Sequence, residues 1–217
     1  FIVRTIREQL SEGRQPRDFC VLYRANFQSR AIEEKLLVAE IPYQVLGTRF
    51  FERKEVKDAL SFVRAALTGN AADIARVANV PPRGIGKVTL LKMLSGKEGE
   101  MRGAVGEKVA AFRRLLERIA HTAQTQPPST LIRFVIAESG MERDFKEDKI
   151  EGAERLENLQ ELVTLAARYD TLPPGEGLEK FLESAALASD QDELKDDKNA
   201  VRLMTVHASK GLEFPVV

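Results

Sequence analysis

The sequence predicts an α/β fold in which an incomplete parallel sheet is interrupted by an inserted all-α helical domain. Near the beginning of the chain, helical and strand patterns alternate, which is typical of a parallel α/β sheet. A long middle region has helical periodicity without a strong strand pattern, and a strand pattern returns only at Val201–Val206. Domain insertion leaves this order. We expect residues 1–68 and 199–217 to form the sheet domain and residues 69–198 to form the insert.

The first region supplies the alternating elements. Ile2, Ile6 and Leu10 recur at four-residue spacing, which predicts a helix. Phe19–Tyr23 is a continuous apolar run, as expected for a strand that is buried on both faces. Similar patterns predict three further elements: a helix at Ser29–Glu40, a strand at Tyr43–Leu46 and a helix at Lys54–Leu67.

The middle region supplies amphipathic helices separated by polar segments. Four patterns predict helices around Val109–Ile119, Leu131–Val135, Leu156–Val163 and Leu178–Ala185. Glycine and proline predict loops at Gly96–Gly106 and Pro173–Gly177. The polar run Asp190–Lys198, in which the charges alternate in sign, predicts a solvated linker.

Composition limits the possible function classes. The 217 residues include 33 basic and 33 acidic side chains, so the net charge gives no strong attraction to nucleic acid, although a local basic face is still possible. The single cysteine excludes an internal disulfide and a multi-cysteine metal site, which favours a reducing, cytoplasmic setting. No apolar segment is long enough to suggest a membrane span. Because both ends fall within apolar patterns, we expect an excised fragment of a longer protein.

The string TVHASKGLEF, at Thr205–Phe214, follows a predicted strand. A polar turn in this place suits a site at the carboxyl edge of a parallel sheet, where ligands usually bind. Thr205 and His207 offer polar groups, Gly211 lets the backbone approach a ligand closely, and Glu213 can accept a hydrogen bond from a ribose hydroxyl. From residue chemistry alone, an ordinary loop is the simpler interpretation.

Two further motifs lie at the ends of the first two predicted strands. Tyr23 and Arg24 end the first strand, where an arginine can reach a phosphate with two hydrogen bonds and the tyrosine can equally be a core residue. The segment Gly47–Leu60 follows the second strand and contains Arg49, Arg53 and two adjacent phenylalanines. Such a segment can hold a nucleic-acid backbone and stack a base, or it can be a solvated helix end with an aromatic plug.

The segment Pro82–Lys87 contains a Gly-Ile-Gly turn before a helix. It is not a phosphate-binding P-loop, because Pro81 falls where the first glycine belongs and Val88 replaces the Ser or Thr. Backbone N–H groups of such a turn can still meet a phosphate. A plain helix-start turn is the alternative.

Taken together, these strings resemble the UvrD/PcrA/Rep family of superfamily 1 DNA helicases from about Phe19 to the end of the chain. Thr205–Phe214 resembles the fifth helicase motif, Val21–Arg30 the fourth, and Gly47–Leu60 the segment that follows it. Arg155–Leu162 also resembles a family segment, to which we assign only a structural role. The resemblance implies part of the second RecA-like domain together with its inserted helical domain.

The resemblance also implies a set of contacts. For ATP, whose Mg²⁺ the family holds elsewhere, it implies contacts from Tyr23, Arg24, Gly211 and Glu213. For single-stranded DNA it implies Thr205, His207, Arg49 and Arg53. For the duplex at a junction with a single strand it implies Arg83, Gly84, Gly86, Lys87 and Thr89.

The expected function is therefore part of an ATP-dependent 3′–5′ DNA helicase that unwinds duplex DNA in repair or replication. The family's P-loop lysine and its Asp-Glu pair are not found in these 217 residues, so we predict that the isolated chain is inactive and needs the first RecA-like domain of its parent. Two alternatives stay open: a non-catalytic DNA-junction-binding or protein-docking module, and the motor subunit of a helicase-nuclease.

Overall fold

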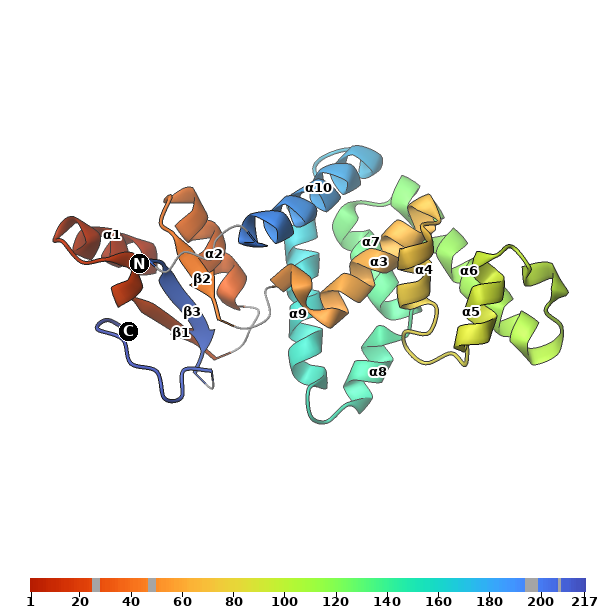
Figure 1. The fold of residues 1–217 in the computed structure, drawn as a ribbon. Coiled ribbons are helices and arrows are strands. Elements are labelled where there is room, and N and C mark those ends of the chain that lie inside the picture. The colour runs from red at the N-terminus through yellow and green to blue at the C-terminus, as the bar shows by residue number, and fades with distance from the viewer. Residues whose placement is uncertain (25–27, 47–49, 194–198, 207) are drawn as a thin grey trace. The chain divides into compact units, whose positions relative to one another are not determined.

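The structure, a computed structural model, consists of two compact units (Figure 1). It describes residues 1–24, 28–46, 50–193, 199–206 and 208–217. One unit contains residues 1–53 and 184–217, and the other contains residues 54–183. The predicted class, an α/β fold with a helical insertion, is confirmed. The units divide at residues 53 and 183, whereas the sequence places the boundaries at 68 and 198, because the helix that begins at Lys54 packs with the helical unit.

A three-stranded parallel sheet forms the centre of the first unit (Figure 1). Strand β1 (Cys20–Tyr23) and strand β2 (Tyr43–Val45) flank strand β3 (Val201–Thr205), so the strand that returns after the insert is the central one. Both pairings are parallel. The return strand therefore completes the sheet rather than extending it, which explains why the first and last parts of the chain form one unit.

Helices α1 (Ile2–Ser11) and α2 (Gln28–Val38) pack with the sheet, and short 3₁₀ turns η1 (Pro16–Asp18) and η2 (Phe50–Glu52) connect the elements. The four-residue apolar spacing in α1 and the buried run in β1 are both confirmed. The core that these elements share consists of Ile6, Phe19, Tyr23, Leu36, Ile41, Tyr43, Val201 and Leu203.

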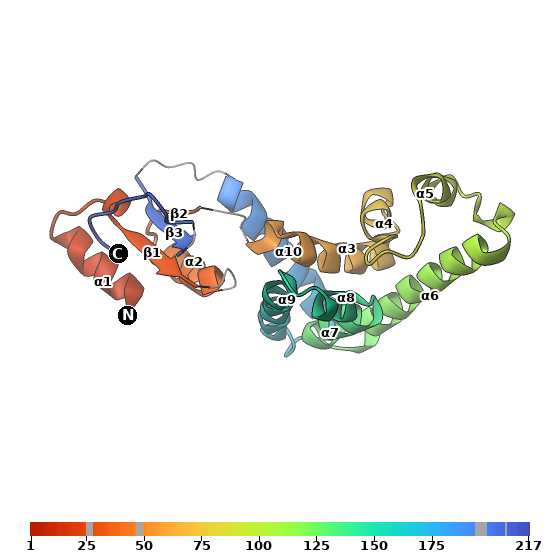
Figure 2. The ribbon, with the colours of Figure 1, turned by 90° about the horizontal axis from the view of Figure 1, so that it is seen from below.

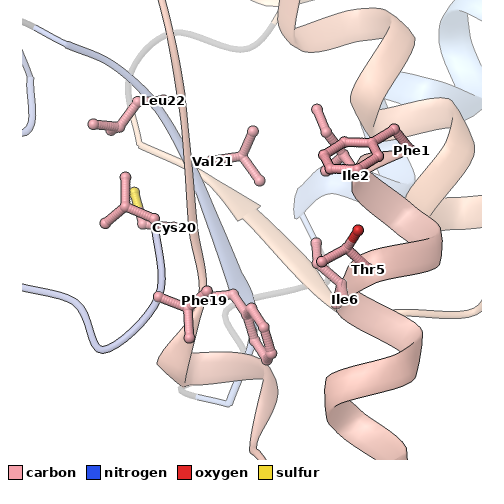
Figure 3. A pocket seen from close by; sticks show the side chains of 10 residues that line it. Phe1, Ile2, Thr5, Ile6, Phe19, Cys20, Val21 and Leu22 are labelled. Carbon is pink, nitrogen blue, oxygen red and sulfur yellow. The ribbon is translucent and has the colours of Figure 1, made fainter.

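The outer edge of β1 carries an apolar pocket of about 230 Å³ between α1 and the strand (Figure 3). Phe19 forms a parallel bridge with Val216 at this edge, where the Cys20 amide donates to the Val216 carbonyl oxygen at 2.9 Å. The pocket lining contains no charged side chain and none of the predicted site residues, so it does not suit a phosphate ligand.

The second unit is helical, and α3 lies at its centre, in contact with α4, α6, α7 and α9 (Figures 1 and 2). Nine residues of α3 are buried, which accounts for the strong apolar periodicity of its sequence. The helices are α3 (Lys54–Thr68), α4 (Ala71–Val77), α5 (Lys87–Leu94), α6 (Gly103–Thr125), α7 (Pro128–Glu138), α8 (Met141–Glu147), α9 (Gly152–Ala167) and α10 (Pro174–Glu193), with a 3₁₀ turn η3 (Glu98–Glu100).

Two expectations for this region were wrong. The predicted loop Pro173–Gly177 is mostly helix, because α10 begins at Pro174, and proline is well suited to a first helical position, where its missing N–H has no partner to lose. The predicted loop Gly96–Gly106 contains η3, and α6 already begins at Gly103. Residues 190–193 of the predicted linker continue α10, and residues 194–198 lie outside the described part of the chain. Within the described ranges, no helix is both long and apolar enough to cross a membrane.

Candidate nucleotide and nucleic-acid interface

The three strands end at the same edge of the sheet, and each end carries one of the predicted motifs. Tyr23 at the end of β1 is in register with Thr205 at the end of β3, and the Val206 amide donates to the Tyr23 carbonyl oxygen at 3.0 Å. Beyond β2, the Leu46 amide donates to the Leu203 carbonyl oxygen at 2.8 Å. Motifs that lie more than 150 residues apart in the sequence are thus neighbours at the carboxyl edge, where parallel sheets bind ligands.

Tyr23 lies inside the core rather than on the surface of this edge. Only 6% of the residue is exposed, and it packs within the core cluster of the sheet unit. Burial, and next the negative charge of Glu33, raise the pKa of the phenol to about 12. The phenol is therefore neutral at physiological pH, and its burial fits the alternative in which Tyr23 is mainly a core residue.

Arg24, directly after Tyr23, is exposed. Its backbone amide donates to the Gln28 Oε1 atom at 3.1 Å, which ties the end of β1 to the first turn of α2. No hydrogen bond or ion pair to its guanidinium is found within the described part of the chain. The side chain is therefore free to meet an anionic ligand at the sheet edge.

The segment after β3 folds into a compact turn. The Thr205 Oγ1 atom accepts from the Ala208 amide at 3.2 Å, and the Ser209 Oγ atom donates to the Val206 carbonyl oxygen at 2.8 Å. Gly211 has a φ of +83°, a left-handed conformation that favours glycine. Glu213 is exposed, whereas His207 lies outside the described residues. The turn therefore places the Glu213 carboxylate in solvent after a fixed backbone reversal.

The segment after β2 is buried where the sequence suggested an open contact. Phe50 and Phe51 are 1% and 7% exposed and meet edge to face at a centroid distance of 5.1 Å. Arg53 is 5% exposed, its guanidinium carbon lies 5.4 Å from the centre of the Phe50 ring, and its Nη2 atom donates to Ser29 Oγ at 3.5 Å. The phenylalanines plug the core, and Arg53 points inward with them. Arg49 lies outside the described residues.

In the helical unit, the side chain of Arg83 also turns inward. Its Nη1 atom donates to the carbonyl oxygens of Val80 and of Pro81, the latter at 3.1 Å. Its Nη2 atom donates to the Ser139 carbonyl oxygen at 2.5 Å, and its guanidinium lies over the rings of Phe62 and Phe112 at 5.5 and 6.0 Å. Burial lowers the pKa of this guanidinium from its usual value. Arg83 thus joins the ends of α4 and α7, and its hydrogen-bonding groups face protein carbonyls rather than solvent.

The turn after Arg83 is open to solvent at its glycines. Gly84 has a φ of +70° and is exposed, as are Gly86 and Lys87, while Thr89 is half-buried. Between the glycines, Ile85 is 3% exposed and anchors the turn in the core. The arrangement leaves the first turn of α5 and its backbone amides facing solvent, as a phosphate-binding turn requires.

Sequence reasoning missed the residue that shapes this turn. The Oδ1 atom of Asn79 accepts from the Arg83 amide at 2.7 Å and from the Ile85 amide at 3.2 Å. Asparagine side chains commonly bond backbone amides that follow them in turns, so an Asn shortly before Pro81 was an available signal. In the described ranges, no group of three or more His, Cys, Asp or Glu side chains is placed to hold a metal ion.

Comparison with known proteins finds one family profile along the whole chain. The profile of the UvrD-like helicase C-terminal domain matches residues 1–103 and 96–217. The chain is 36% identical over 239 residues to the DNA helicase II of Escherichia coli (strain K12), covering all of this chain and 33% of that protein. It is 33% identical over 238 residues to the ATP-dependent DNA helicase PcrA of Staphylococcus epidermidis (strain ATCC 12228), again covering all of this chain and 32% of the relative. The chain therefore spans about a third of the length of these relatives.

Proposed function

The chain belongs to the family of UvrD-like helicase C-terminal domains, and on this premise we propose that it forms part of an ATP-dependent 3′–5′ DNA helicase. The similar proteins are named DNA helicase II and ATP-dependent DNA helicase PcrA, and they are about three times as long. One observation carries the proposal: the Tyr23–Arg24 and Thr205 motifs are in register on adjacent parallel strands. Separately recognised strings that meet at one sheet edge support a shared site.

We assign to this edge one half of a nucleotide site. The exposed Arg24 offers a planar guanidinium that suits phosphate oxygens, and Glu213 offers an exposed carboxylate for ribose hydroxyls. Gly211, with its positive φ, allows the backbone to pass close to the ligand. ATP with its Mg²⁺ supplies the phosphoryl chemistry when it is bound, and the first RecA-like domain of the parent protein holds the other half of the site.

The same edge is proposed to meet single-stranded DNA through Thr205, His207 and Arg49. Thr205 is in register with the residue that precedes Arg24, so a displacement of one strand end moves the other. This adjacency supports a mechanism in which closure around the nucleotide changes the grip on the strand. Arg53, being buried against Phe50, supports this surface from beneath, and we propose no direct DNA contact for it.

For the duplex beside a single strand, the proposed contact is the turn that contains Gly84, Gly86, Lys87 and Thr89. Its exposed glycines let a phosphate approach backbone amides at the start of α5. Arg83 holds the turn from inside the unit and is not itself proposed to touch DNA.

Substitution of Arg24 in the full-length gene product tests the nucleotide assignment. We expect Arg24→Ala to lower DNA-stimulated ATP turnover by roughly a hundredfold or more, since arginines that face transferred phosphates contribute rate factors of this order. Arg17→Ala is the matched control, because Arg17 is exposed before the opposite end of β1. Equal turnover in the two variants would contradict the assignment of Arg24.

The purified 217-residue chain tests whether this part works alone. We expect it to bind a junction of duplex and single-stranded DNA without hydrolysing ATP, because the family's P-loop lysine and catalytic carboxylates are not among its residues. DNA-stimulated ATP turnover by this chain would overturn the half-site assignment.

A further inference from the structure

Lys108, on α6, reaches the Gly84–Gly86 turn although it lies more than 20 residues away in the sequence. A methyl group placed on Gly84 would come within 2.6 Å of the Lys108 Nζ atom and 3.5 Å of its Cε atom. The ammonium therefore lies directly over the backbone of Gly84, in the space that any larger residue would fill. α5 and α6, the helices that follow the turn and carry Lys108, both belong to the helical unit (Figure 2).

The charge of Arg83 is not available at this surface. Its guanidinium already donates to the carbonyl oxygens of Pro81 and Ser139 and packs over two aromatic rings. The positive groups that face solvent at the turn are consequently lysines: Lys87 at the first position of α5, and Lys108.

The ammonium of Lys108 is free to take an anionic ligand. Lys108 is exposed, and within the described ranges no acceptor is found for its Nζ atom. Lysine binds phosphate as a compact point charge, which suits a position above a glycine backbone. The glycine is required twice at position 84, since its φ of +70° is left-handed and its missing side chain leaves room for the ammonium.

We propose that Lys108 binds a backbone phosphate of duplex DNA held at the Gly84–Gly86 turn, in the place that the sequence assigned to Arg83. The inference rests on the proposed duplex contact of this turn and adds to it a residue from α6. The ligand is a phosphodiester of the duplex, bound without base specificity, because a lone ammonium carries no sequence information.

Fluorescence anisotropy of a labelled hairpin duplex with a single-stranded tail tests the proposal on the 217-residue chain over a series of salt concentrations. Each lost phosphate contact lowers the slope of log K against log salt concentration by about 0.9. We expect Lys108→Gln to lower the slope by this amount and to weaken binding by about threefold to tenfold at low salt. Lys108→Arg should restore most of both quantities.

Two variants make the outcome specific. Lys180→Gln is the matched control, because Lys180 is an exposed lysine on α10, paired with Glu176 at 2.6 Å. It should leave the slope unchanged. Lys87→Gln should lower the slope in the same way as Lys108→Gln. If Lys87→Gln lowers the slope and Lys108→Gln does not, the assignment of Lys108 is overturned while the duplex contact stands. Failure of the unsubstituted chain to bind the duplex would overturn the proposed duplex contact and this inference with it.

Discussion

Three arginines that the sequence connects with ligands end in different surroundings. Arg24 is exposed at the sheet edge, whereas Arg53 is buried against Phe50 and Arg83 donates to carbonyl oxygens inside the helical unit. The residue type alone does not distinguish these cases, because a guanidinium suits a phosphate and a set of helix-end carbonyls equally well. Exposure and partners, which depend on tertiary packing, decide between the two roles.

Substitution of Arg83 by lysine tests whether its fork-shaped guanidinium, rather than its charge, holds the turn. A single ammonium cannot span the carbonyls of Pro81 and Ser139 together. We expect Arg83→Lys to lower the free energy of unfolding by about 2–3 kcal/mol in urea denaturation, since hydrogen bonds from charged groups contribute on this scale. Arg133→Lys on the exposed face of α7 is the control and should change it by less than about 0.5 kcal/mol. Equal stability of the two variants would contradict the internal role of Arg83.

Tyr23 gives the sheet unit a defined response to alkaline pH. Its phenol has a pKa of about 12 in the fold and about 10 when exposed, so the unfolded chain loses this proton first. The stabilisation is present in full below about pH 10 and is lost as the pH rises through about 12. Difference absorbance between the native chain and a Tyr23→Phe variant should show one tyrosinate that forms near pH 12. Its appearance at the ordinary phenol pKa would show that Tyr23 is solvated.

Elements with a strong periodic pattern could be predicted from the sequence, and their ends could not. The continuous apolar run of β1 and the four-residue spacing of α1 each required one structure. The start of α10 at Pro174 was missed because proline and glycine there resemble a loop, while proline is also acceptable at a first helical position. Local chemistry is the same in both cases, and only packing against the rest of the unit selects the helix.

The candidate site followed the same division. The sequence predicted that the motifs at Tyr23 and Thr205 end parallel strands, which places them at one edge, and the register brings them together. The approach of Lys108 to Gly84 had no sequence signal, because the contact joins two helices whose relative placement depends on the whole helical unit. Contacts within an element or along a sheet edge are thus more predictable than contacts between helices.

At the scale of paired elements, Asn158 on α9 holds Glu55 on α3. The Asn158 Nδ2 atom donates to the Glu55 Oε1 atom at 2.6 Å, and both residues are buried. We expect Asn158→Ala to lower the free energy of unfolding by about 2–3 kcal/mol, because it leaves a buried carboxylate with fewer donors. Gln160→Ala, an exposed change on the same helix, is the matched control and should have little effect in urea denaturation. Similar midpoints for the two variants would exclude this pair as a major link.

At the scale of the whole molecule, the two units differ in how the chain builds them. The helical unit uses one continuous segment, residues 54–183, whereas the sheet unit is assembled from residues 1–53 and 184–217. The central strand β3 comes from the second of these segments, so the sheet lacks its middle until the chain returns from the insert. The sheet unit consequently depends on closure of a long loop, and an insert that folds by itself shortens that loop effectively.

Expression of residues 54–183 alone tests whether the insert is an independent folding unit. Its core is drawn from its own helices, with α3 in contact with α4, α6, α7 and α9, and a continuous segment of this size with its own core is expected to fold as a domain. We expect a helical circular dichroism spectrum and a single cooperative thermal transition. Asn158→Ala in this segment should lower the transition temperature, which ties the transition to the α3–α9 packing. A gradual, non-cooperative loss of helix would mean that the insert needs the sheet unit to fold. Residues 1–53 expressed alone are the complementary case and should not form the sheet, because β1 and β2 pair only through β3.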